Sequence, residues 1–491
     1  TTGGLNTLVG GLSGDALTIG NSNVALGYLA LSRDTTGDRS TAIGFQTLAN
    51  QNFTSNTDTY NVAVGYNAGV NVTTGVNNTL IGGLAGDAIT TGSQNTATGY
   101  LALSADTTGS QNTAYGRSSL VSNTTGANNT ASGYASLASN TTGNYNTASG
   151  MYSLYVNSTA SNNTAMGYES LKANTTGHSN VALGANALDA NTTASINTAV
   201  GFNAGTTNTT GNLTAFGGYA AQAQTTGTNT TALGSFSLYA NTTGANNTAV
   251  GSAFGATRGV LQDNTTGGNN TAMGVAALSA NTTASNNTAV GYNSLGANTT
   301  GTFNTALGRQ ALLLNTTANN NVAIGGNSLF QNTTGGSNTA VGAYALDSNT
   351  TASNNTAVGE NSLQGNTTGT RNTAVGKSTL SANTTGGNNT AVGYNSLATN
   401  SLGGRNVAMG EGSLQTMNPA STSNTYNIGM GYDAGKSITT GIGNTFVGGL
   451  CGQGTDDGGN NTAVGYLALR ANCGNGNSAF GRQALDVCTG G

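Results

Sequence analysis

The chain has 491 residues, of which 77 are Gly and only 28 are charged, with a formal net charge of −4. One His, three Cys and no Trp leave few of the side chains from which active sites are usually built, so we expect no enzyme. Twelve cations spread over this length cannot form a phosphate-neutralising stripe. No apolar run approaches the 18 or so residues that a membrane span needs. We therefore expect no nucleic-acid partner, no membrane insertion within this segment and no cofactor.

A short motif repeats along the whole chain. Residues 287–291 read Asn-Thr-Ala-Val-Gly, and the same pattern returns at 304–308 and 321–325. The closing glycine recurs 28 times from Gly10 to Gly481, mostly in steps of 17 residues. A period this constant is typical of a solenoid in which each copy forms one coil.

One coil reads Asn-Thr-Ala-Val-Gly-x-x-Ser-Leu-x-x-Asn-Thr-Thr-Gly-x-x. The β-branched residues before the first glycine favour a strand, and Asn-Thr-Thr-Gly favours a turn. A turn in each half of a 17-residue coil leaves no room for a helix. The sequence predicts two short strands and two turns per coil. The fold class is all-β: a parallel β-solenoid (β-roll) of about 28 coils.

The repeat predicts one continuous array over residues 1–491. Steps of 21 or 23 residues place insertion loops near 49–60, 255–269 and 415–426. Residues 59–120 also align with 425–485, and residues 1–3 match the tail of a coil. We expect this chain to be a segment of a longer array, or a processed form of one.

The strand half of the coil predicts self-association. Ala two residues before the glycine and a large apolar residue one before it must point to opposite faces. If Ala fills the interior, the larger residue forms an outward ridge, which is broken only at Thr98, Tyr115, Ser132 and Ser149. A stripe of this size exceeds what monomers expose, so we predict that it packs on copies of itself in a homotrimer. The alternative is a wider single-chain coil with both residues inside. The candidate inter-chain packing residues are Val290, Leu307, Ile324, Val341, Val358, Val375 and Val392.

The pattern Asn-x-Ala-[Val/Ile/Leu]-Gly-x-x-[Ser/Ala] resembles the head repeat of trimeric autotransporter adhesins, and similar repeats occur in phage tail fibres. The resemblance covers the strand half of nearly every coil, whereas the Asn-Thr-Thr-Gly turn is an addition. It implies three chains, each a parallel β-roll, around a common axis in an extracellular rod.

The Asn-Thr-Thr turn offers repeated Asn-x-Thr acceptors on a turn that we expect to face solvent. The alternative is that Asn and Thr serve turn geometry and hydrogen-bond ladders between coils. Thr hydroxyls are also possible sites of O-linked sugar. The candidate glycosylation residues are Asn123, Asn140, Asn174, Asn191, Asn208, Asn241, Asn264, Asn281, Asn298, Asn315, Asn332, Asn349, Asn366 and Asn383.

The three cysteines all lie in the last three coils. Cys473 and Cys488 occupy nearly the same point of successive coils, whose backbones lie about 4.8 Å apart, within disulfide range. We treat this pair as a candidate disulfide, with three buried small residues as the alternative. Cys451 would then be left over, available for pairing with another chain.

These observations predict a structural, non-catalytic subunit of an extracellular fibre or fibril, a rigid and nearly uncharged rod with a possible glycan coat. The alternative is a trimeric adhesin head or phage tail-fibre shaft that binds a host surface receptor. We expect self-association as a homotrimer or an end-to-end filament, and a location outside the cell, on a cell surface or a virion surface.

Overall fold

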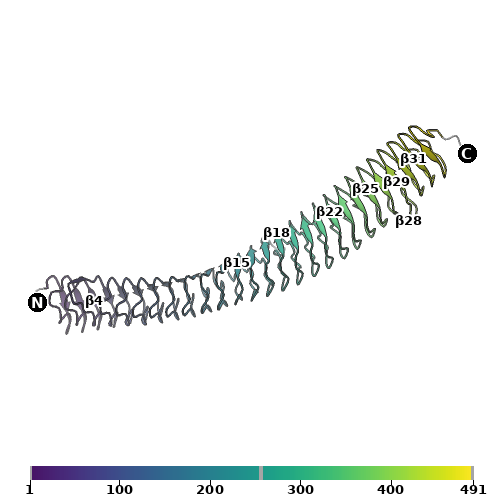
Figure 1. The fold of residues 1–491 in the computed structure, drawn as a ribbon. Helices are drawn as coiled ribbons and strands as arrows, with labels where there is room; N and C mark the ends of the chain where they lie inside the picture. The colour runs from purple at the N-terminus through teal and green to yellow at the C-terminus, as the bar shows by residue number, and fades with distance from the viewer. Residues whose placement is uncertain (1–2, 254–257, 488–491) are drawn as a thin grey trace. The chain divides into compact units, whose positions relative to one another are not determined.

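The computed structural model describes residues 3–253 and 258–487. Over these residues the chain contains no helix and forms a parallel β-solenoid of about 28 coils with a 17-residue period, which confirms the predicted fold class. The chain divides into two compact units, Thr1–Thr243 and Gly244–Gly491. Within each unit, successive coils stack directly on one another (Figure 1).

Each coil contributes one short strand to a parallel sheet within its unit. The coil strands of the first unit are β1 (Thr7–Val9), β2 (Val24–Leu26), β4 (Thr41–Ile43), β6 (Val62–Val64), β7 (Thr79–Ile81), β8 (Thr96–Thr98), β9 (Thr113–Tyr115), β10 (Thr130–Ser132), β11 (Thr147–Ser149), β12 (Thr164–Met166), β13 (Val181–Leu183), β14 (Thr198–Val200), β15 (Leu213–Phe216) and β16 (Thr230–Leu233). Those of the second unit are β17 (Thr248–Val250), β18 (Thr271–Met273), β19 (Thr288–Val290), β20 (Thr305–Leu307), β21 (Val322–Ile324), β22 (Thr339–Val341), β23 (Thr356–Val358), β24 (Thr373–Val375), β25 (Thr390–Val392), β27 (Val407–Met409), β29 (Ile428–Met430), β30 (Thr445–Val447), β31 (Thr462–Val464) and β32 (Ser478–Phe480).

The register places equivalent residues above one another. In β19 and β20, Ala289 pairs with Ala306 and Val290 with Leu307. The alanines are fully buried, whereas the residues on either side of them are half-buried or exposed. Because this alternation holds in nearly every strand, Ala fills the interior and the larger residue forms the outward ridge. The alternative with both residues inside is wrong.

The second half of the coil is a series of turns, so the prediction of two strands per coil is wrong. The residues two and four positions after the strand glycine take left-handed backbone angles, as in Asn293 (φ 54°) and Leu295 (φ 52°). Two such residues so close together bend the chain too sharply for a strand. The strand glycine itself is required at its position: a Cβ on Gly291 (φ +130°) would lie 2.5 Å from the carbonyl oxygen of Gly308.

The core volume is kept constant by paired exchanges between two positions. Leu occupies the fourth position after the glycine in most coils and is fully buried there, as in Leu295. Where Gly69 and Gly86 replace it, Leu80 stands at the usual alanine position, and a Cβ on either glycine would lie 2.7 or 2.8 Å from its methyl groups. Phe446 fills the same space beside Gly435 and Gly452.

Two insertions form small sheets of their own. In the first, β3 (Gly37–Asp38) pairs with β5 (Thr57–Asp58), and in the second, β26 (Gly403–Gly404) pairs with β28 (Ser423–Asn424). Both use an arginine over a tyrosine ring: Arg39 lies 5.5 Å from the centroid of Tyr60, and Arg405 lies 5.5 Å from that of Tyr426. The third predicted loop, 255–269, falls partly outside the described residues.

Candidate functional site

The fourteen candidate glycosylation asparagines are all fully buried. Asn298 is representative: its Nδ2 donates to Asn281 Oδ1 at 3.0 Å and to the carbonyl oxygen of Gly301 at 2.9 Å. Its own Oδ1 accepts from Asn315 Nδ2 at 2.9 Å. The expectation that these side chains face solvent is therefore wrong. Because a glycan would have to attach to the nitrogen that makes these bonds, the geometry favours the hydrogen-bond ladder.

The two threonines of the turn have different roles. Thr299, the first, is half-buried, and its Oγ1 donates to the carbonyl oxygen of Thr316 in the next coil at 3.1 Å. Thr300, the second, is exposed. The hydroxyl groups that solvent reaches on this turn are those of the second threonine, so O-linked sugar stays a prediction for that position.

A second asparagine ladder runs beside the strand, at the first position of the repeat. The backbone nitrogen of Asn304 donates to Asn287 Oδ1 at 2.9 Å, and Asn304 Nδ2 donates to the carbonyl oxygen of Ala318 at 2.8 Å. No role was predicted for this asparagine. The signal for this ladder in the sequence was the recurrence of asparagine directly before a β-branched residue. Asparagine has a low strand propensity, so its repetition at this position indicates a role other than strand formation.

The turn-asparagine ladder of the first unit begins at a carboxylate. Asp106 occupies the asparagine position, one coil after the fully buried Ile89. Asp106 Oδ1 accepts from the backbone nitrogen of Gly109 at 2.8 Å, and Oδ2 accepts from Asn112 Nδ2 at 3.4 Å. Burial raises the pKa of Asp106 to about 7, although these donors oppose the shift.

The ridge lies on the outer face of the coil strands. Its seven candidate packing residues follow one another from β19 to β25, where Leu307 is 45% exposed and the others are half-buried by their neighbours in the stack. The ridge in the first unit is also open, with Leu26 45% and Met166 47% exposed. The structure thus leaves an apolar column uncovered on each unit.

Aromatic side chains form exposed stacks in several coils, at the position just after the strand glycine. Tyr28, Phe45 and Tyr66 stack on one another with ring centroids 5.7 and 5.3 Å apart. Tyr28 and Tyr66 are 50% and 58% exposed. These rings add exposed apolar area two residues after the ridge position.

The cysteines show no reactive site within the described residues. Cys451 is free and buried, and its Sγ donates to the carbonyl oxygen of Ala463 at 3.2 Å. Burial raises the pKa of the Cys451 thiol to about 11, which keeps it protonated and unreactive at neutral pH. Cys473 is buried and disulfide-bonded, as predicted. Its predicted partner, Cys488, lies outside the described residues, so the pairing itself stays a prediction.

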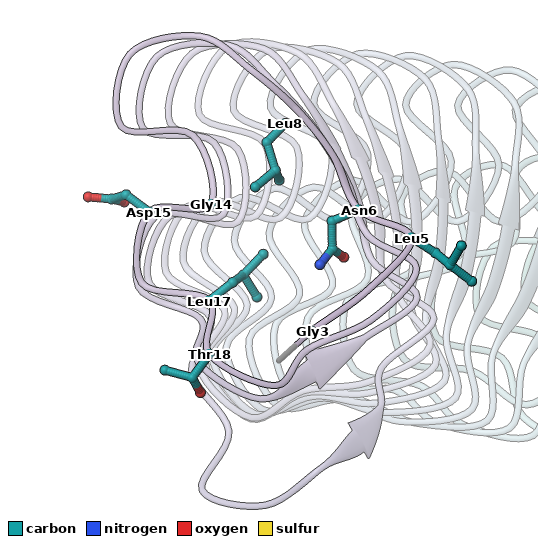
Figure 2. Close-up of a pocket in the computed structure, with 8 residues that line it drawn as sticks. All are labelled: Gly3, Leu5, Asn6, Leu8, Gly14, Asp15, Leu17 and Thr18. Carbon is teal, nitrogen blue, oxygen red and sulfur yellow. The ribbon is translucent and has the colours of Figure 1, made fainter. Parts of the chain in front are cut away.

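Small cavities lie at the end of the coil stack and between neighbouring coils. One cavity, of about 280 Å³, lies at the first described coil. Leu8 and Leu17 point into the interior there (Figure 2). In other coils these positions are covered by a neighbouring coil, so this cavity is the open end of the core. Another, of about 180 Å³, is lined by Glu411, Asp433 and Lys436, and there Lys436 Nζ lies 3.0 Å from Asp433 Oδ2.

Within residues 3–253 and 258–487, no three His, Cys, Asp or Glu side chains are placed to hold a metal ion. No helix in that part of the chain is long and apolar enough to cross a bilayer. Comparison with protein-family models and with curated proteins finds no match to this chain. The resemblance to adhesin head repeats therefore stays a prediction.

Proposed function

We propose that this chain is a structural, non-catalytic subunit of an extracellular fibre, in which three copies associate through their ridges. The observation that carries the proposal is the uncovered apolar column. Of the 28 coil strands, 24 end in Val, Leu, Ile, Met or Phe, and each of these side chains points away from the core. Full burial of an exposed side chain of this kind contributes about 1.5–3 kcal/mol. Most ridge side chains are already half-buried, so each adds about half of that value, and the column as a whole still favours a partner.

The size of the ridge fits a stable interface. The fourteen coils of the second unit, whose ridge is apolar throughout, make a face about 67 Å long at about 4.8 Å each. With a width of about 10 Å, the face of one unit covers about 670 Å², against the 300–600 Å² of the largest apolar patch on a typical monomer. A standard interface buries about 800 Å² per partner, so the face of this one unit provides most of that area.

The rest of the coil suits a passive rod. Side chains and backbone are hydrogen-bonded from coil to coil, and only 28 of 491 residues are charged. A surface with so few charges attracts few partners by electrostatics. A glycan coat, if present, belongs on the exposed second threonines rather than on the buried asparagines.

The mass of the native assembly tests the proposal, with three times the 48.2 kDa of the chain expected. We expect the triple variant Val341→Lys, Val358→Lys and Val375→Lys to run as a monomer with an unchanged β-sheet circular dichroism spectrum. The matched control places the same charges on the exposed turn column, as Thr334→Lys, Thr351→Lys and Thr368→Lys, and should assemble normally. A well-folded native chain with the mass of a monomer would rule the proposal out.

A second candidate function is binding to a host surface receptor, as in an adhesin head or a tail-fibre shaft. One observation favours it: a cavity of about 210 Å³ beside the second insertion, lined by Asn388, Leu402 and residues 422–424. Residues 420–422 next to it are exposed. Binding of the full chain to an array of immobilised cell-surface glycans should then be lost when residues 420–422 are replaced by glycine, and retention of all binding would exclude this site.

A further inference from the structure

The apolar ridge has one interruption, on four consecutive coils. Thr98, Tyr115, Ser132 and Ser149 end strands β8 to β11 and pair directly with one another in the sheet. Tyr115 is 56% exposed and Ser132 is also exposed. A polar segment four coils long is therefore set into an otherwise apolar column.

The interruption is flanked by apolar residues on both sides. Ile81 pairs with Thr98 at one end, and Met166 pairs with Ser149 at the other. These two side chains are 40% and 47% exposed. The one cation on these coils next to the ridge, Arg117, lies 5.9 and 5.8 Å from the ring centroids of Tyr100 and Tyr134. The guanidinium is thus already engaged by aromatic faces.

A purely periodic ridge cannot fix how two copies align. If one copy shifts by one coil, about 4.8 Å, every aliphatic side chain meets an equivalent partner and only the end contact is lost. The second unit illustrates this, because all fourteen of its ridge residues are apolar. The aliphatic column therefore favours association without specifying the register.

The polar segment removes this equivalence. In register, the hydroxyl groups of one copy lie opposite those of its partner and can hydrogen-bond with them. After a shift by one coil, Thr98 of one copy faces Ile81 of the other, and Met166 of the first copy faces Ser149 of the other. Each such hydroxyl is desolvated without a partner, which is unfavourable. A single buried asparagine sets the register of a coiled coil for the same reason.

We infer that Thr98, Tyr115, Ser132 and Ser149 set the register in which a second copy of this chain docks on the ridge. The inference rests on the proposed function and adds the alignment to it: copies run parallel with identical coils side by side. A closed rotational assembly around an axis parallel to the stack requires this alignment.

Photocrosslinking of the full chain tests the inference. Tyr168, exposed next to the ridge on the coil of Met166, is replaced by benzoylphenylalanine, and crosslinked peptides are identified by mass spectrometry. In the native background, crosslinks should fall on the 166–168 coil of the partner, with about a tenfold or larger excess over the coils one step away. In the variant Thr98→Val, Tyr115→Leu, Ser132→Val and Ser149→Val, crosslinks should spread to the coils of Ser149 and Leu183, while the assembly keeps its mass. The control, with Val290, Val341, Val358 and Val375 changed to Ile, should stay in register.

The outcomes separate the inference from the proposal on which it rests. Spread crosslinks in the native assembly, or in-register crosslinks in the all-apolar variant, would overturn the register role and leave self-association standing. A native chain that is monomeric and gives no crosslinks would overturn the proposed function, and the register role with it.

Discussion

Leucine rarely adopts a left-handed backbone conformation, yet it does so in most coils of this chain. The conformation costs a residue with a Cβ about 1–2 kcal/mol. Full burial of the leucine side chain contributes about 1.5–3 kcal/mol, which offsets that cost. Leu295, at φ 52° and 0% exposed, shows both effects at one position. Where glycine removes the strain, a larger residue elsewhere in the coil returns the lost volume: Leu80 and Phe446 at the alanine position, and Leu213 at the first position of the repeat beside Gly205.

This exchange predicts a compensating pair of substitutions. Phe446→Ala alone should destabilise its coils by about 3–5 kcal/mol, because it empties the space beside Gly435 and Gly452. The double variant Phe446→Ala with Gly452→Leu restores the usual Ala and Leu arrangement, since the atoms nearest to a Cβ at position 452 all belong to Phe446, and should recover more than half of that loss. Hydrogen exchange of the strand amides of β30 and β31 measures the change locally. A double variant that is less stable than Phe446→Ala would contradict the volume exchange.

Asp106 predicts an unusual pH dependence. Its pKa in the folded chain is raised to about 7, above its value of 3.8 when exposed. Between these two pH values the folded chain binds the additional proton, so stability is highest at low pH and falls as the pH rises from about 4 to 7. The full difference corresponds to about 4 kcal/mol at most.

The amide of Gly109, which donates to Asp106, reports this change in hydrogen exchange as a function of pH. Asp106→Asn should flatten the profile, since an amide does not titrate. The control is Asp457→Asn on an exposed turn, which should leave the profile unchanged. A native profile without a fall between pH 4 and 7 would show that the carboxylate stays ionised inside the ladder.

At the scale of the element, periodicity predicted the strand and which side of it faces inward. An alanine between two larger strand-forming residues, repeated in register, is enough to predict both the strand and its inward-facing side. The second half of the coil was not predictable in the same way. Ser-Leu alternation looks like a strand, but the sequence does not show that Asn293 and Leu295 take left-handed angles, which the stack of backbone hydrogen bonds imposes.

Of the candidate functional features, the apolar ridge was predicted correctly from the sequence, whereas the exposure of the turn asparagines was not. Composition placed Asn-Thr-Thr in a turn, and an isolated turn exposes its side chains. In a stack, the turn of one coil covers the turn of the next, so the asparagine that begins it becomes buried and bonds to its equivalents. The ridge was predictable because it depends only on alternation within one strand. The trimer, the receptor and the location outside the cell remain predictions.

The arginine–tyrosine contacts in the two insertions lead to a prediction about local stability. An exposed cation over an aromatic ring contributes about 0.5–1 kcal/mol, so Arg405→Ala should loosen the second insertion without disturbing the coils. Exchange of the Thr425 amide, which donates to the carbonyl oxygen of Gly404 at 2.9 Å, should accelerate about two- to fivefold. Arg371→Ala, on a coil without an insertion, is the control. Faster exchange throughout β27 and β29 would mean that the arginine supports the coils themselves.

In a solenoid, the free energy of unfolding is approximately the sum of the stabilities of the coils and of the contacts between neighbouring coils. A destabilised coil therefore affects mainly itself and its neighbours. One weak point lies in the first unit at a 16-residue coil, between Gly201 and Gly217. There the turn-asparagine ladder is interrupted, and the Oδ1 atoms of Asn191 and Asn208 are buried without a hydrogen-bond partner among the described residues. Each unpaired atom costs about 1–3 kcal/mol. Local opening in this unit should begin at that coil.

The single strand per coil also decides how either unit would respond to being pulled. The covalent chain runs around each coil, while hydrogen bonds and side-chain packing hold one coil on the next, so tension along the stacking direction loads mainly non-covalent contacts. A stretched unit would peel rather than shear, and each released coil of 17 residues would add about 60 Å of slack chain. Sister subunits bound along the side would share that load. Lateral cohesion would then act as a mechanical reinforcement as well as a cover for apolar surface.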